Sequence, residues 1–245
     1  MTGDSAVRIA LLLPDVLGTY SDRGNATVLA QRLRMRGITA DLLEVSAQAT
    51  APTACDVYVL GGGEDAAQSF AVQWLLRQPA LLTTMNTAQV LAVCAGMQVL
   101  GDWMQGSDAR RITGAGVLDL TTTAGRRRAV GEVVADCTHP DVETLTGFEN
   151  HRGHTHLGPG ATPFGRVQSG TGNGDGTDGV LTASVVGTYL HGPVLARNPT
   201  LADFLVSRAT GQALSPLEVP DQEAARRLHL GRARRRQGRS VLRWR

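Results

Sequence analysis

The sequence contains no lysine, so all 24 of its basic residues are arginines. The P-loop pattern of ATPases ends on Lys followed by Ser or Thr, and the chain is therefore not expected to hydrolyse ATP by that mechanism. No apolar run approaches the ~20 residues of a membrane-spanning helix. The three cysteines are widely spaced and form no C-x-x-C pair, which argues against a disulfide framework and a structural zinc site. Hydrophobic and charged contents of 42% and 19% are typical of a globular protein.

Charge is divided unevenly along the chain. Nine arginines lie in residues 226–245, where no acidic residue occurs, and the remainder carries 15 arginines against 22 acidic residues, a net charge of −7. Such a basic tail suits nucleic acid, membrane phosphate or an acidic partner, and a solvated helix is the simpler alternative. The body has no basic stripe interleaved with aromatics, so no nucleic-acid partner is expected. Residues 1–6 lack the order of a secretory signal, which favours a cytoplasmic location.

The first half of the sequence alternates between strand-like and helix-like patterns. Apolar runs predict strands over residues 7–13, 39–45, 56–60 and 88–93. Helical spacing predicts helices over residues 24–36, 64–77 and 96–104. This alternation predicts an α/β fold in which a mostly parallel sheet is flanked by helices.

The second half has strand-like segments joined by turns. These segments cover residues 116–120, 128–134, 144–149 and 180–189, and residues 170–179 read as a flexible loop. Helices are expected over residues 199–210 and 222–236. We expect one α/β domain over residues 1–210 and an arginine-rich helical extension over residues 211–245.

Cys94 stands out among the cysteines. An apolar strand stops at Cys94, and two small residues, Ala95 and Gly96, precede a helix. This is the layout of a nucleophile elbow, at the carboxyl end of a strand where open α/β sheets bind ligands. The helix N-terminus is expected to lower the pKa of the thiol, and a buried structural cysteine is the alternative. Cys55 and Cys137 lack this context and are expected to be structural.

A catalytic thiol needs a base, and six histidines are available. His191 follows an apolar strand-like segment, so it is able to meet Cys94 at one edge of the sheet; a turn histidine is the alternative. His151, His154 and His156 form a pattern that could bind a transition metal. On an extended chain, however, His151 and His154 face opposite ways and no further ligand completes the set, so no metal site is expected.

A triple glycine, Gly61–Gly63, lies between a buried strand and a helix. The backbone N–H groups of such a turn can bind an anion or complete an oxyanion hole, and a plain tight turn is the alternative. This turn, Cys94 and His191 together resemble the class I glutamine amidotransferases of the cobyric acid synthase-like branch. Three further segments are similar to the glutaminase subunits of lipid II isoglutaminyl synthases, namely Tyr20–Asn25, Gly147–His151 and Gly187–Pro193. The resemblance covers most of residues 7–210.

The resemblance implies a thioester mechanism without a cofactor. Cys94 would attack the side-chain amide of glutamine, and His191 would activate Cys94 and then protonate the departing ammonia. Backbone N–H groups of Gly62 and Ala95 would stabilise the tetrahedral oxyanion.

The resemblance also implies a substrate-binding arginine. Arg128 matches the residue that holds glutamine, and its guanidinium fork suits an α-carboxylate. Arg126 and Arg127 are the alternatives, because the sequence does not fix which of the three side chains points inward.

A partner subunit follows from the same resemblance. It would be an ATP-dependent, Mur-ligase-like protein in a heterodimer, which uses the ammonia to convert the D-glutamate of the lipid II stem peptide into D-isoglutamine at the inner face of the membrane. Ammonia supply to another ligase, as in corrinoid amidation, is an alternative. A non-catalytic scaffold that binds through its arginine tail is another.

The sequence departs from the wider family at two places. Pro193 stands where many class I amidotransferases carry a glutamate two residues after the histidine, which agrees with the cobyric acid synthase-like branch but leaves His191 without an orienting acid. The partner is then a candidate source of that carboxylate. Residues 152–155 read Arg-Gly-His-Thr where Gly-Gly-Arg-Thr is common, so no role is assigned to His154.

Overall fold

The computed structural model describes residues 6–19, 22–106 and 108–241. Its first sheet is six-stranded, in the order β11-β12-β4-β3-β1-β2. Its strands are β1 (Val7–Leu12), β2 (Ala40–Val45), β3 (Val57–Leu60), β4 (Gln89–Val93), β11 (Val180–Leu181) and β12 (Val185–Thr188). All neighbours run parallel except β11 and β12, which form an antiparallel pair. The predicted α/β fold with a mostly parallel sheet is thus confirmed.

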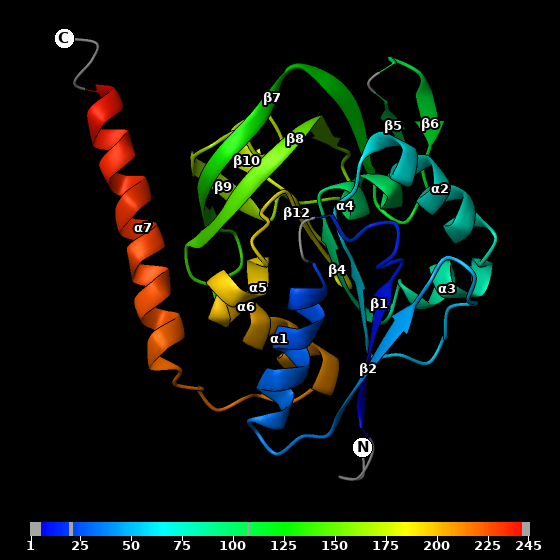
Figure 1. The fold of residues 1–245 in the computed structure, drawn as a ribbon, viewed down its shortest axis with the longest axis horizontal. Coiled ribbons are helices and arrows are strands. Elements are labelled where there is room, and N and C mark those ends of the chain that lie inside the picture. The colour runs from blue at the N-terminus through cyan, green and yellow to red at the C-terminus, as the bar shows by residue number, and fades with distance from the viewer. Residues whose placement is uncertain (1–5, 20–21, 107, 242–245) are drawn as a thin grey trace.

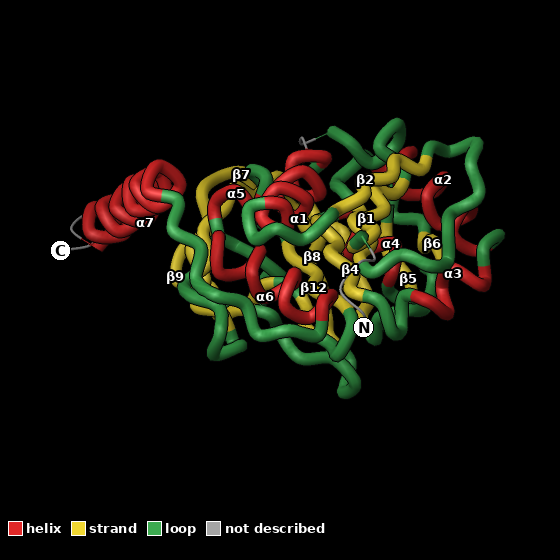
Figure 2. The backbone as a smooth tube through the Cα atoms, turned by 90° about the horizontal axis from the view of Figure 1, so that it is seen from below, coloured by secondary structure: helices red, strands yellow, loops and turns green. Residues whose placement is uncertain are grey.

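Two groups of helices flank this sheet (Figures 1 and 2). One group consists of α1 (Arg23–Arg34), α5 (Val194–Arg197) and α6 (Pro199–Thr210), which contact one another. The other consists of α2 (Asp65–Leu76), α3 (Pro79–Thr84) and α4 (Ala95–Leu100). Because helices cover both faces, every residue of β3 and β4 is buried, as their continuous apolar runs require.

A second sheet, mainly antiparallel, stands beside the first. Its strands are β5 (Trp103–Gln105), β6 (Arg111–Thr113), β7 (Leu120–Cys137), β8 (Leu145–Leu157), β9 (Gly165–Ser169) and β10 (Thr177–Asp178). The long strands β7 and β8 form a hairpin whose register shifts between Ala124 and Ala129. This irregularity carries the three consecutive arginines out of the regular ladder.

Several predicted elements differ from the structure. The strand expected over residues 116–120 is absent except at Leu120, where β7 begins. The helix expected over residues 96–104 ends at Leu100, because Asp102 N–H donates to the Leu120 carbonyl at 2.8 Å and residues 103–105 continue as β5. The strand expected over residues 180–189 is the β11–β12 hairpin. The expected flexible loop contains the short strand β10, which pairs with β9.

The C-terminal helix α7 (Pro220–Val241) contacts the β7–β8 hairpin and α5. Arg226 anchors it: this side chain is buried and donates to Asn198 Oδ1 at 2.9 Å and to the Arg197 carbonyl at 3.2 Å. The division of the chain at residue 210 stays a prediction. No helix within the described residues is long and apolar enough to cross a membrane.

Candidate active site

Cys94 lies at the junction of β4 and α4 with φ 52° and ψ −109°. A non-glycine residue in this left-handed region is strained, and such strain is concentrated at functional sites. The turn packs tightly against the end of β3, since a Cβ on Gly96 would lie 2.8 Å from the Leu60 carbonyl oxygen. The strand, strained turn and helix form the geometry expected of a nucleophile elbow.

The thiol opens onto a pocket of about 370 Å³ between the two sheets. Charged and polar residues dominate its lining, among them Glu64, Gln98, Arg128, Asn150 and His151. Arg128 Nε donates to Asn150 Oδ1 at 2.5 Å, and its NH2 group lies 3.7 Å from Glu64 Oε1. A pocket with both charges on its wall suits a small zwitterion.

The structure separates the three candidate arginines. All three line a hollow on the β7 irregularity, but of the three only Arg128 also lines the Cys94 pocket. Of the three, Arg128 is therefore the one placed to meet a molecule bound beside Cys94.

His191 is brought to the same edge of the sheet as Cys94. In the parallel β12–β4 pair Thr188 lies opposite Val93, and Cys94 N–H donates to the Thr188 carbonyl at 2.8 Å. His191 follows three residues later and is buried. Its backbone exchanges two hydrogen bonds with Phe148 of β8, at 2.7 and 3.1 Å, which ties this loop to the second sheet.

Asp22, at the start of α1, is a site residue to which the sequence reasoning gave no role. It is fully buried, and its Oδ2 lies 4.0 Å from His191 Nδ1 and accepts the Gly62 N–H at 2.7 Å. Burial raises the pKa of Asp22 to about 6. The signal was the Tyr20–Asn25 motif, of which residues 20 and 21 lie outside the described part of the chain.

The two predicted oxyanion donors, the backbone N–H groups of Ala95 and Gly62, contact different side chains. The Ala95 N–H lies against the Cys94 thiol. The Gly62 N–H donates to Asp22 instead, so it must leave that carboxylate before it can serve an oxyanion. A Cβ on the preceding Gly61 would collide with the Leu17 carbonyl and lie 2.7 Å from Asp22 Cβ, so only glycine fits there.

The expected lowering of the Cys94 pKa is wrong. Burial raises the pKa of this thiol to about 12, Asp22 acts in the same direction, and the Ala95 N–H and Arg128 oppose them. The helix α4 has only six residues, so its end is outweighed by desolvation. Burial, aided by His151, lowers the pKa of His191 to about 4. Thiol and imidazole are therefore both neutral at pH 7.

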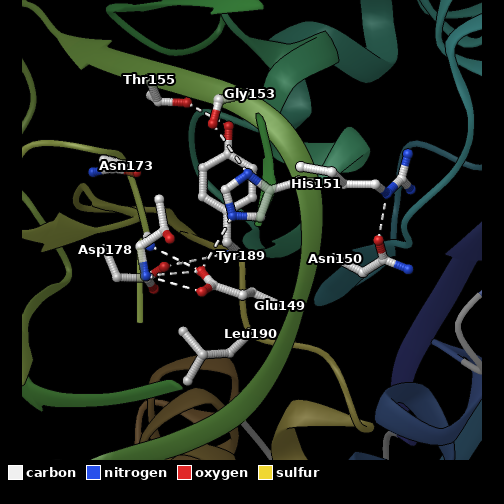
Figure 3. A network of polar contacts seen from close by, with 12 residues as sticks. Glu149, Asn150, His151, Gly153, Thr155, Asn173, Asp178, Tyr189 and Leu190 are labelled. Carbon is white, nitrogen blue, oxygen red and sulfur yellow. Dashed lines mark hydrogen bonds and ion pairs between the residues drawn. The ribbon is translucent and has the colours of Figure 1, made fainter. Parts of the chain in front are cut away.

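His151 forms a buried network behind the pocket (Figure 3). Its ring nitrogens face the Gly153 carbonyl at 3.0 Å and Glu149 Oε2 at 3.4 Å, and its ring stacks on Tyr189 at 3.7 Å. Along the extended β8, His151 is buried whereas His156 is exposed, so the histidines do not converge. The described residues contain no group of three or more His, Cys, Asp or Glu that could hold a metal ion.

The chain is similar to known proteins over most of its length. The family model of the CobB/CobQ-like glutamine amidotransferase domain matches residues 8–199. The chain belongs to this family. The match includes the strained cysteine, the arginine of the pocket and the buried histidine described above.

The amidotransferase resembles two curated proteins over most of its length. It is 32% identical to the GatD subunit of lipid II isoglutaminyl synthase from Staphylococcus aureus, a match that covers 91% of this chain and 94% of the relative. It is 33% identical to the corresponding subunit of Streptococcus pneumoniae, over 83% and 80%. A cobyric acid synthase of Listeria monocytogenes is 31% identical, but the match covers 55% of this chain and 28% of that protein.

Solved structures agree on the fold. The amidotransferase superimposes on a glutamine amidotransferase crystal structure with a TM-score of 0.57 and 17% identity, over 82% of this chain and 98% of the other. The glutaminase domain of Trypanosoma brucei CTPS gives a TM-score of 0.53 at 12% identity, over 89% and 99%.

Proposed function

We propose that this amidotransferase is the glutaminase subunit of a lipid II isoglutaminyl synthase. The observation that carries the proposal is Cys94, held in a strained elbow and open to a pocket that Arg128 lines. The matches to two GatD subunits, which extend over nearly the whole chain, support the choice of this synthase over others of the family.

Glutamine is the substrate that the pocket fits. The Arg128 guanidinium binds the α-carboxylate through its planar fork, and Glu64, on the same wall, attracts the α-ammonium group. The side chain then extends toward Cys94, which places the carboxamide carbon before the thiol.

The reaction proceeds through a γ-glutamyl thioester. His191 takes the proton of Cys94, and the sulfur adds to the carboxamide carbon while the Ala95 N–H stabilises the oxyanion, joined by the Gly62 N–H once that group has left Asp22. The C–N bond breaks, the proton on His191 passes to the leaving nitrogen, and ammonia departs. Water, deprotonated by His191, then cleaves the thioester to glutamate and restores the thiol.

The ammonia is used by a partner. We infer a heterodimer with an ATP-dependent, Mur-ligase-like subunit that amidates the D-glutamate α-carboxyl of the lipid II stem peptide to D-isoglutamine. The chain itself meets lipid II only through this partner, in the cytoplasm at the inner face of the membrane. A carboxylate of the partner near His191 would link glutaminase activity to assembly.

Ammonia release from L-glutamine tests the proposal. It is measured for the wild type, Cys94→Ala and the matched control Cys137→Ala, each with and without a Mur-ligase-like partner from the same cell. We expect release that is lost in Cys94→Ala, kept in Cys137→Ala and increased by the partner. Full release by Cys94→Ala would overturn the enzymatic proposal and favour a scaffold. Release coupled to corrinoid rather than lipid II amidation would overturn the choice of acceptor alone.

A further inference from the structure

Two arginines beside the glutamine pocket, Arg126 and Arg127, take no part in the proposed glutaminase mechanism. We propose that the hollow they line is a binding site for a phosphoryl group, held by Arg126, Arg127 and His154. Binding at this site is independent of the proposed function. Its effect on glutamine rests on that function.

The hollow is created by the irregularity of β7. Ala124 and Ala129 pair with Gly153 and His151 of β8, so residues 125–128 stand opposite a single residue of that strand. The surplus residues cannot continue the ladder, and they bend the strand locally. The result is a hollow of about 710 Å³, lined by residues 124–129, His154 and Thr171.

The two arginines keep their charges available to a ligand. Arg126 and Arg127 are exposed, and neither guanidinium forms a hydrogen bond or an ion pair with a residue in the described part of the chain. Each guanidinium carries five N–H donors in a planar fork and stays charged at every accessible pH. The hollow therefore holds two positive charges that no acidic side chain of the described residues neutralises.

His154 is the third polar group of the hollow. Its ring lies between two glycines, because a Cβ on Gly125 would lie 2.8 Å from Nε2 and a Cβ on Gly174 would lie 3.0 Å from Nδ1. Neither ring nitrogen forms a hydrogen bond with another residue that the structure describes. A half-buried imidazole is thus held in place beside the arginines, with both nitrogens unoccupied by the protein.

This donor set suits a phosphoryl group better than a carboxylate. A phosphoryl group carries a charge of about −1.5 to −2 and three acceptor oxygens on one tetrahedral centre. Two guanidinium forks and an imidazole N–H can reach different oxygens of such a group, whereas a carboxylate offers one charge and two oxygens in a plane. The Thr171 hydroxyl, on the same wall, supplies a further donor.

Arg128 links the hollow to the glutamine pocket, because it lines both. Its Nε donates to Asn150 Oδ1 at 2.5 Å, which holds the guanidinium at the glutamine pocket. A phosphoryl group in the hollow attracts the same guanidinium and so competes with the α-carboxylate of glutamine. Occupation of the hollow should therefore raise KM for glutamine, and by linkage glutamine should weaken binding in the hollow.

Calorimetric titration of the full chain tests the binding. The probes are inorganic phosphate, pyrophosphate and farnesyl diphosphate, each at constant ionic strength. We expect the wild type to bind pyrophosphate, and Arg126→Gln and Arg127→Gln each to weaken this binding about tenfold, because each removes charge-assisted hydrogen bonds. His154→Ala should weaken it as well. The matched control is Arg166→Gln, since Arg166 is an exposed arginine of β9 outside the hollow, and it should bind like the wild type.

The order of affinities identifies the source of the phosphoryl group. Tighter binding of farnesyl diphosphate than of pyrophosphate would assign the hollow to a lipid-linked diphosphate. Equal affinities would assign it to a free diphosphate, and tightest binding of inorganic phosphate would assign it to a single phosphoryl group.

Glutaminase kinetics in the complex with the partner test the link through Arg128. Saturating pyrophosphate should raise KM for glutamine about fivefold with kcat unchanged, in the wild type and in Arg166→Gln. It should have no effect in the double variant Arg126→Gln, Arg127→Gln. Without pyrophosphate, the double variant should keep the KM of the wild type.

The outcomes separate the site from the proposed function. Absence of binding by the wild type, or unchanged affinity for all three probes in the double variant, would overturn the site. Binding without a rise of KM would overturn the link through Arg128. Absence of ammonia release from the wild-type complex would refute the proposed function, whereas the titrations would still decide the site.

Discussion

Three adjacent arginines on β7 lie in a local irregularity of the strand, between Ala124 and Ala129. All three line the neighbouring hollow, but of the three only Arg128 also lines the Cys94 pocket. Contact with a molecule bound beside Cys94 is therefore expected of Arg128 alone among them.

Replacement of these arginines gives the first prediction. Arg128→Ala should raise KM for glutamine about 100-fold, because a charge-assisted bidentate pair contributes about 3 kcal/mol. Arg128→Lys should recover part of this loss, since lysine keeps the charge but not the fork. Steady-state kinetics measure both, with Arg127→Ala as the matched control. An equal rise of KM in Arg127→Ala would show that general positive charge, rather than the fork, binds the substrate.

Asp178 provides a prediction on stability. Burial raises its pKa from about 3.8 to about 6, so between these values the folded state holds a proton that the unfolded state has lost. The contribution of Asp178 to stability therefore falls as pH rises from 4 to 6. An asparagine side chain stays neutral at every pH, so the free energy of unfolding of Asp178→Asn relative to wild type should improve by about 3 kcal/mol from pH 4 to pH 7.

Denaturant unfolding at several pH values measures this difference. Asp175→Asn, which removes an exposed carboxylate from the same segment, is the control. A pH trend of the same size in both variants would show that burial of Asp178 is not its cause.

At the scale of elements, the sequence predicts the helices and strands that a local pattern marks. It does not predict features that depend on contacts between distant segments. The strands β1 to β4 were predicted because continuous apolar runs mark strands covered on both faces. The helix α3 was missed because the predicted helices pass from residues 64–77 to residues 96–104 and leave Pro79 outside, although proline often begins a helix. The length of β7 and β8 was missed because both carry many polar residues on exposed faces.

The same division applies to the residues of the candidate site. Cys94 and His191 stand at strand ends, which a local pattern can reveal. The place of Asp22 beside His191 could not be found this way, because it depends on a contact between the start of α1 and a loop near the other end of the chain. Asp178 was assigned to a loop for a similar reason: its burial follows from the packing of β10 and the following turn against β12.

The docking of α7 gives a prediction at this scale. Arg226→Ala should lower the free energy of unfolding by about 2 to 4 kcal/mol, because loss of the buried guanidinium leaves the Arg197 and Thr144 carbonyls without this donor, whereas Asn198 Oδ1 keeps the Thr146 N–H. Arg227→Ala is the matched control, since Arg227 is the exposed neighbour on the same helix. Urea unfolding compares the two. Equal, small effects would mean that α7 does not depend on this anchor.

At the scale of the whole molecule, residues of both sheets form the candidate active site. The first sheet supplies Cys94 and the segment that leads to His191, and the second supplies Arg128 and His151. Together the two sheets leave Cys94 only 5% exposed. The same burial that makes electrostatic interactions strong also keeps Cys94 and His191 neutral at rest.

This resting state predicts how the isolated chain reacts with iodoacetamide. A thiol with a pKa of about 12 gains thiolate throughout the accessible range, so alkylation of Cys94 should rise about tenfold per pH unit from pH 7 to pH 9 without a plateau. At pH 7 it should be slower than alkylation of the partly exposed Cys137, which serves as an internal control when both sites are followed by mass spectrometry. In the complex with the partner, Cys94 should react faster at pH 7, because added charge near His191 favours the ionised pair. A plateau near neutral pH in the isolated chain would instead show that the thiolate and imidazolium are already formed before assembly.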